Sequence, residues 1–242
     1  TAGAAYADLI PRMTGGTFTY NLTGGTIELG ANTAGNYFQV FRNNPVGLTA
    51  YKYVKYSGTN TYLTDYKALS SAVTIDSALI ITGDVVVDCI EASGQARSFD
   101  GNGGLIMDGG RLRIKNVSTT NPELAATNAG TSYNITGGTI EFYGSTSTQQ
   151  HNIRARYGSP TVQIQYNNIE INATAGNYST PAGAGNADPV ASLYIKGALT
   201  VFSPAVFRLD ATDFIEGPGN FILSSGSGLM YANTNGITSG NT

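Results

Sequence analysis

The chain has 242 residues, of which only 12% are charged and 31 are glycine, and its formal net charge is −3. A surface with so little charge excludes the basic stripe by which proteins bind nucleic acid or anionic lipid. The single cysteine, Cys89, excludes an internal disulfide and a thiolate metal cluster. No run approaches the roughly 18 apolar residues of a membrane-spanning helix, so we expect no membrane insertion.

Short apolar segments recur along the chain, one about every 27 residues. They begin near Gly24, Ala50, Ser77, Gly104, Gly137, Thr161, Ala191 and Ile215. Apolar and polar residues alternate within them, which is typical of a half-buried strand, and Gly-Gly, Asn-Asn and Gly-Asn turns separate them. The alternation predicts that the following side chains point inward: Ile27, Leu29, Ile140, Phe142, Leu193 and Ile195.

A longer repeat is superimposed on this rhythm. The segment "TYNLTGGTIEL" at 19–29 returns as "SYNITGGTIEF" at 132–142, an offset of 113, and "SALIITGDVVVD" at 77–88 returns as "ASLYIKGALTVF" at 191–202, an offset of 114. We interpret 1–242 as a single segment with a tandem repeat of about 113 residues, copy one at about 14–126 and copy two at about 127–239. Ile27 and Ile140 are then expected in equivalent places, four coils apart.

A unit of about 27 residues with two or three short strands fits one coil of a solenoid. Each coil leaves a face unburied until another stacks on it, which gives repetition a physical reason. Crossovers between parallel strands are overwhelmingly right-handed. The prediction is therefore an all-β fold, a right-handed parallel β-helix. An antiparallel sandwich is the alternative, but its strands recur every 8 to 12 residues without a long repeat.

Two short patterns bear on how such coils would stack. The Gly-Gly pairs of "TGGTI" would permit positive φ at corners where coils approach closely. Asn167 and Asn168 either bond up and down the stack through their amides or form a simple turn.

Two Gly-rich acidic turns are candidate metal sites. Their oxygen-bearing side chains are Asp100, Asn102 and Asp108 in "FDGNGGLIMDGG", and Asp210, Asp213 and Glu216 in "LDATDFIEGPG". Hard oxygen ligands on flexible turns suit Ca²⁺, although the spacing matches neither an EF-hand nor the nonapeptide calcium repeat. Asp and Gly are also ordinary turn residues. We favour the interpretation that both segments are plain turns. Beyond calcium, no cofactor is expected.

Tyrosines near the start of the chain are a candidate sugar-binding strip. Tyr51, Tyr53 and Tyr56 alternate with Lys52 and Lys55, and exposed rings in such a row could stack on sugars. Alternation puts Tyr51 and Tyr53 on the side opposite Lys52, which favours burial.

A second candidate ligand site lies beside the only histidine, His151. Arg154 and Arg156 could bind a sugar acid, but the nearest carboxylates in the sequence are Glu141 and Glu170. Alternation places both arginines on one outer face, so a solvated face is favoured.

No catalytic motif is present: the sequence has no nucleophile elbow, phosphate loop or dinucleotide fingerprint. Cleavage of a polysaccharide requires at least two ionisable groups in fixed relation, and the sparse carboxylates fall mainly on turns and outward strand positions. We therefore expect no enzyme. A polysaccharide lyase or glycoside hydrolase on a parallel β-helix is the alternative, and an ice-binding solenoid, which needs flat rows of Thr, is a distant one.

Segments such as "TGGTIELG", "TGGTIEFYG", "GLIMDGGRLRI" and "ALIITGDVVVD", set between Asn- and Thr-rich turns, resemble the repetitive regions of very large surface proteins of Bacteroidota. These proteins are exported by the type IX secretion system and include gliding-motility adhesins. The resemblance implies an extracellular, cell-surface adhesin or stalk segment, a rigid rod that presents a binding surface away from the cell. Its implied partners are a surface polysaccharide or an abiotic surface, and neighbouring repeats of the same long chain.

Overall fold

The computed structural model describes residues 5–7, 24–31, 36–39, 51–65, 73–90, 99–100, 103–115, 133–144, 150–153, 155–157, 162–174, 177–179, 192–209 and 213–231. Every regular element in these ranges is a β-strand. A search of the same ranges finds no helix long and apolar enough to cross a membrane.

Within the described ranges, the strands form sheets of ten, six, four and two strands. The ten-stranded sheet has the order β1 (Ala5–Ala7), β3 (Asn36–Gln39), β5 (Thr61–Asp65), β7 (Val86–Ile90), β10 (Arg111–Lys115), β12 (Thr139–Tyr143), β16 (Gln165–Asn172), β18 (Ser192–Val201) and β20 (Phe214–Glu216), with β21 (Asn220–Leu223) also paired to β18. The six-stranded sheet has the order β2 (Thr26–Ala31), β4 (Tyr51–Gly58), β6 (Val73–Ile81), β9 (Gly104–Met107) and β11 (Tyr133–Ile135), with β8 (Phe99–Asp100) paired to β6. The four-stranded sheet contains β13 (Gln150–Asn152), β17 (Asn177–Ser179), β19 (Val206–Leu209) and β22 (Gly228–Tyr231), and the two-stranded one β14 (Arg156–Tyr157) and β15 (Val162–Gln163).

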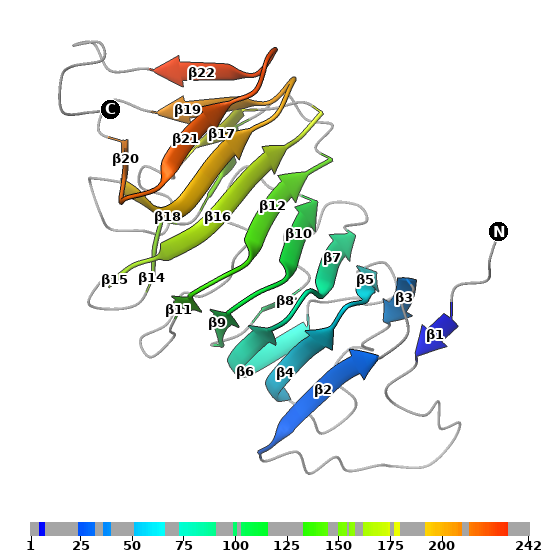
Figure 1. Ribbon diagram of the computed structural model, residues 1–242. Helices are drawn as coiled ribbons and strands as arrows, with labels where there is room; N and C mark the ends of the chain where they lie inside the picture. The colour runs from blue at the N-terminus through cyan, green and yellow to red at the C-terminus, as the bar shows by residue number, and fades with distance from the viewer. Residues whose placement is uncertain are drawn as a thin grey trace.

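These sheets are the faces of a parallel β-solenoid (Figure 1). Every described ladder is parallel except the one between β14 and β15, and paired residues lie about 26 positions apart, as Leu79 and Leu105 do. The two larger sheets run together over about four turns. The predicted all-β parallel solenoid is confirmed, and the sandwich alternative is wrong because its ladders would be antiparallel.

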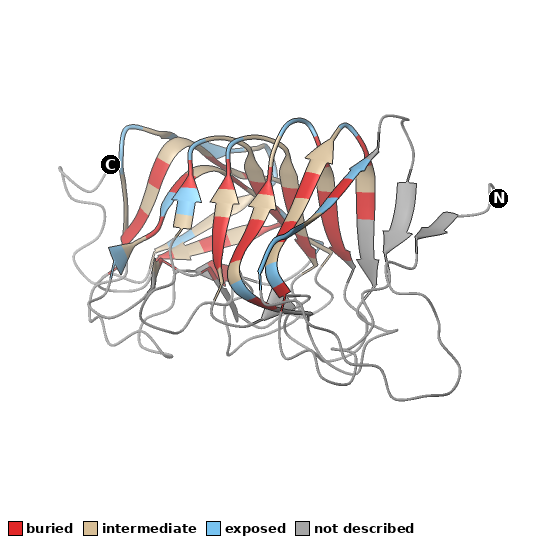
Figure 2. Ribbon diagram, turned by 90° about the horizontal axis from the view of Figure 1, so that it is seen from below, coloured by how far each residue is buried: buried red, intermediate tan, exposed pale blue. Residues whose placement is uncertain are grey.

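The core is built from rows of apolar side chains that stack from coil to coil. One such row is Val87, Leu112, Ile140, Ile169 and Leu199, all buried. Bands of buried residues on many of the described strands are visible in Figure 2. Burying one aliphatic side chain of this size contributes about 1.5–3 kcal/mol, so each added coil stabilises its neighbours.

The inward positions expected from the sequence are confirmed. Leu29, Ile140, Phe142, Leu193 and Ile195 are buried in this core. Ile27 is partly buried and packs against it.

The two "TGGTIE" segments do not occupy equivalent places. Ile27 lies in the six-stranded sheet, where the row continues through Val54, Leu79 and Leu105 to Tyr133. Ile140 lies in the ten-stranded sheet. The prediction of equivalence is wrong, because a strand that alternates with period two can serve either sheet of the solenoid.

The corner before β12 confirms the role expected of the Gly-Gly pair. Gly138 has φ of +76°, and a Cβ atom on Gly137 would lie 2.1 Å from the backbone oxygen of Asp108 in the preceding coil. Backbone contact this close is possible only where no side chain intervenes.

Asn168 bonds in both directions along the stack. Its Nδ2 donates to the Gly138 carbonyl at 3.3 Å, and its Oδ1 accepts from the Ala198 amide at 3.0 Å.

Candidate functional site

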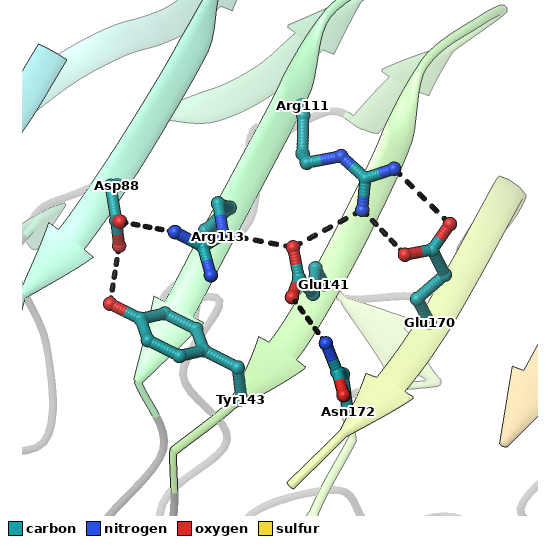
Figure 3. A network of polar contacts seen from close by, with 7 residues as sticks. All are labelled: Asp88, Arg111, Arg113, Glu141, Tyr143, Glu170 and Asn172. Carbon is teal, nitrogen blue, oxygen red and sulfur yellow. Dashed lines mark hydrogen bonds and ion pairs between the residues drawn. The ribbon is translucent and has the colours of Figure 1, made fainter. Parts of the chain in front are cut away.

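A row of charged side chains crosses the outer face of the ten-stranded sheet. Asp88, Arg113, Glu141 and Glu170 share one register on β7, β10, β12 and β16. Each is next to an inward residue of the core row, so alternation turns it outward. With Arg111, Tyr143 and Asn172, these residues form the polar network of Figure 3, here called the charge ladder.

Arg113 joins the two most buried carboxylates of the ladder. Its Nη1 donates to Asp88 Oδ2 at 2.5 Å, and its Nε donates to Glu141 Oε2 at 2.9 Å. Its Cζ lies 4.2 Å from the centroid of the Tyr143 ring, within the range of a cation–π contact. Contacts with Asp88, Glu141 and Tyr143 therefore hold the Arg113 guanidinium in one orientation.

Arg111 joins Glu141 to the next strand. Its Nη1 donates to Glu141 Oε2 at 3.1 Å and to Glu170 Oε2 at 2.5 Å, and its Nη2 donates to Glu170 Oε1 at 3.2 Å. The pairing with Glu170 is bidentate, the strongest geometry for an arginine and a carboxylate. Asn172 donates to Glu141 Oε1 at 3.1 Å, so both oxygens of Glu141 are bonded.

Two contacts of the ladder skip a strand. Arg111 on β10 reaches Glu170 on β16, across β12. The Tyr143 hydroxyl on β12 donates to Asp88 on β7, across β10. Stacking by itself joins only adjacent coils, so these bonds fasten coils that do not touch through their backbones.

The two buried carboxyls differ in their electrostatics. Asp88 and Glu141 are 5% and 4% exposed. Burial raises the pKa of Asp88, and the bonds from Tyr143 and Arg113 do not cancel that effect. Burial also raises the pKa of Glu141, but the bonds from Arg113 and Asn172 and the charges of both arginines outweigh it, so its pKa is lowered. Glu141 lies between two guanidinium groups and Asp88 contacts one.

The charged groups of the ladder are bonded mainly to one another. Three carboxylates and two guanidinium groups are bonded to one another, with Tyr143 and Asn172 filling the remaining positions. The charged groups that solvent still reaches are Arg111, Arg113 and Glu170. The arrangement suits a fastening between coils better than an open ligand site.

Alternation turns Arg111, Arg113 and Glu141 outward, but the sequence pattern does not bring the residues of the ladder together. The structure buries Glu141 under Arg111, Arg113 and Asn172. A usable signal is present: charges of mixed sign recur at 88, 113, 141 and 170, spacings of 25, 28 and 29 that match the coil length.

The candidate metal ligands are only partly described. Asp108 is exposed on a turn, Asp213 is buried, and Glu216 is half-buried and accepts a bond from Gln163 Nε2. Among the described residues, no group of three His, Cys, Asp or Glu side chains could hold a metal ion. Calcium binding stays a prediction, because the following lie outside the described residues: the side chain of Asp100, and all of Asn102 and Asp210.

The tyrosines of the candidate sugar-binding strip lie on two sides of β4. Tyr51 and Tyr56 are buried in the core, and the Tyr56 ring packs 5.3 Å from that of Tyr62. Tyr53 is half-buried on the outer side, because the ladder with β6 shifts register between Tyr51 and Tyr53. The prediction that Tyr51 and Tyr53 face the same way is wrong, since a bulge reverses the alternation.

Of the two candidate arginines, only Arg156 is described. It is half-buried on β14, and its Nη2 donates to Ser192 Oγ at 3.5 Å. Arg154 lies outside the described residues, as does the side chain of His151. A sugar-acid site at this point stays a prediction.

Comparison with known proteins gives no match: no family model, no curated protein and no solved structure matches this chain. The likeness to Bacteroidota surface adhesins therefore stays a prediction.

Proposed function

We propose that this chain is a segment of an extracellular, cell-surface adhesin or stalk: a rigid rod that holds a binding surface away from the cell. The observation that carries the proposal is the charge ladder, which bonds its own groups together and ties non-adjacent coils. A rod that transmits force between a cell and a surface requires coils that do not separate singly.

The geometry of the stack supports a spacer. The first described strand, β1, and the last, β22, lie at opposite ends of the solenoid (Figure 1). Each coil adds about 4.8 Å of strand spacing along the axis, so length grows in proportion to the number of coils. Sparse charge and abundant Thr, Ser and Asn leave a hydroxyl- and amide-rich surface suited to weak contacts with neutral glycans.

The test compares one copy of the chain with two and four copies linked in tandem, on a quartz-crystal balance coated with a neutral glycan or left bare. We expect weak binding by one copy and stronger binding by tandem copies, because tethering raises the effective concentration. Binding that does not improve with copy number would contradict adhesion and leave the role of spacer.

A polysaccharide lyase or glycoside hydrolase is the second candidate, and one observation favours it. The pKa values of Asp88 and Glu141 are displaced in opposite directions on one outer face, a pattern that acid–base pairs share. Arg113 lies between the two carboxyls and both are buried, so a sugar would reach them only by displacing it. Release of reducing or unsaturated sugar that Glu141→Gln abolishes would favour the enzyme; we expect no release from either protein.

A further inference from the structure

The six-stranded sheet stops at β11, partway along the stack. β11 pairs with β9 on one side, and the described chain has no ladder on its other side. In the neighbouring sheet the next coil lies 29 positions further along the chain, as Thr139 and Asn168 show, so the strand expected beside β11 is Val162–Ile164. That segment pairs in antiparallel fashion with β14 instead, and the Ile164 amide donates to the Ala155 carbonyl at 2.8 Å. The backbone ladder on this side of the solenoid is therefore interrupted between two consecutive coils.

The β14–β15 pair is fastened to the coils that follow it. Gln163 Nε2 on β15 donates to Ser192 Oγ on β18 at 2.6 Å, and also to Glu216 on β20. Arg156 Nη2 on β14 donates to the same Ser192 hydroxyl at 3.5 Å. Ser192 is fully buried, so these bonds are shielded from water. The pair therefore belongs to the part of the stack on the C-terminal side of the interruption.

Side chains cross the interruption where the backbone ladder is missing. Lys196 on β18 reaches past the coil of β16, and its Nζ donates to the Ile135 carbonyl on β11. Asn167 Nδ2 donates to the Gly138 carbonyl at 3.0 Å, at the corner that leads into the ten-stranded sheet. Ile135 and Ile164 are 3% and 0% exposed, so the core is closed at this point. Apolar packing and a few side-chain bonds hold this side of the two coils together.

The ten-stranded side of the same two coils is continuous. β12 and β16 pair over five positions and run side by side in Figure 1. The charge ladder reinforces this side, because Arg111 on β10 bonds Glu170 on β16 and Asn172 bonds Glu141. One side thus has a backbone ladder with ion pairs, and the other has neither between β11 and β15 in the described chain. Parts of a protein with fewer backbone hydrogen bonds open at a lower free energy than the rest.

We infer that the interruption is a joint in the rod. The six-stranded side opens between β11 and β15, the ten-stranded side stays paired and acts as the hinge, and Lys196 is the latch that holds the joint closed. Opening on one side bends the stack without separating its coils, because the charge ladder fastens the hinge. This inference does not depend on the adhesin proposal.

The first test compares two buried isoleucines of the same coil. Ile164 lies at the joint and Ile169 in the ten-stranded sheet, and both are 0% exposed. Each is changed to cysteine, and the rate of modification by a thiol reagent is measured in native buffer and corrected for the stability of each variant in urea. We expect Ile164→Cys to react about tenfold faster or more than Ile169→Cys, because local opening exposes it. The wild-type chain, whose Cys89 is buried, gives the background rate. Equal corrected rates would overturn the joint.

The second test adds Lys196→Met to both cysteine variants. Loss of the bond to the Ile135 carbonyl should make Ile164→Cys react about fivefold faster and leave Ile169→Cys unchanged. Lys196→Arg, which keeps a donor, should restore most of the protection. Lys55→Met is the control, since Lys55 bonds Glu28 on the exposed surface away from the joint, and should change neither rate. An effect of Lys196→Met on both cysteines equally, or on neither, would overturn the latch.

Discussion

Gly24 and Gly137 stand at the same place in the two "TGGTIE" segments, but only Gly137 is packed against a neighbouring coil. A Cβ atom on Gly137 would meet the Asp108 backbone oxygen at 2.1 Å, whereas one on Gly24 would meet nothing within 4 Å. The same local sequence is therefore packed differently at its two places in this solenoid.

The pair gives a first prediction. Gly137→Ala should lower the free energy of unfolding by about 2–3 kcal/mol, because the backbone of the adjoining coil must shift. Gly24→Ala should change it by less than about 1 kcal/mol, since the methyl group occupies open space. Urea denaturation of both variants measures the difference. Equal effects would contradict the distinct placement of the two segments.

The fold class is predictable from this sequence for a specific reason. Alternation such as Ile140–Glu141–Phe142 fixes which side chains face inward, and the coil-length spacing predicts parallel stacking. What the alternation does not fix is the sheet that a strand joins, because that depends on how many corners the chain turns between strands. Ile27 and Ile140 differ in this respect although their surroundings read alike.

The contacts within the charge ladder could not be predicted from the local sequence pattern, for a related reason. Outward placement of Asp88, Arg113 and Glu141 follows from alternation, but which charge meets which depends on register across coils of unequal length. A single bulge has the same consequence for Tyr53, whose side chain faces away from that of Tyr51. Side-chain pairing between coils is a property of the assembled stack.

A second prediction concerns Arg113. Arg113→Met keeps most of the side-chain volume but leaves Asp88 and Glu141 close together without the guanidinium that joins them. We expect the free energy of unfolding at neutral pH to fall by about 3 kcal/mol, as when one partner of a buried ion pair is removed. Chemical denaturation measures it.

The matched control is Lys55→Met. Lys55 pairs with Glu28 at 3.0 Å on an exposed surface, so its loss should cost less than about 1 kcal/mol. If the two variants are equally stable, the ladder does not fasten the coils.

A third prediction follows from Asn168, which bonds to the coil on either side of it. Asn168→Ala removes the partner of the Ala198 amide and one donor to the Gly138 carbonyl. A hydrogen bond contributes about 1 kcal/mol, so the Ala198 amide should exchange its proton about fivefold to tenfold faster. Exchange measured by NMR should change little at amides several coils away, because coupling is mainly between neighbours. Asn134→Ala, an exposed amide on β11, is the control.

The last prediction concerns pH, because the two buried carboxyls of the ladder respond to it with opposite sign. The pKa of Glu141 is lowered in the fold, so its contribution to stability is present above its unfolded value of about 4.3 and is lost as pH falls through the folded value. The pKa of Asp88 is raised by burial, so its contribution is full below about 3.9 and is lost as pH rises through the folded value.

Glu141→Gln and Asp88→Asn should therefore change the pH dependence in opposite directions. Between pH 3 and pH 7, the stability of the wild-type chain changes by the sum of both contributions and of all other groups. Glu141→Gln removes a contribution that grows with pH, so the gain in stability from pH 3 to pH 7 should be smaller than in the wild type. Asp88→Asn removes a contribution that shrinks with pH, so the gain should be larger. Urea midpoints at several pH values measure the pH dependence of stability in the two variants. If both variants shift this dependence in the same direction, the pKa values of Asp88 and Glu141 are not displaced in opposite directions, and the prediction is contradicted.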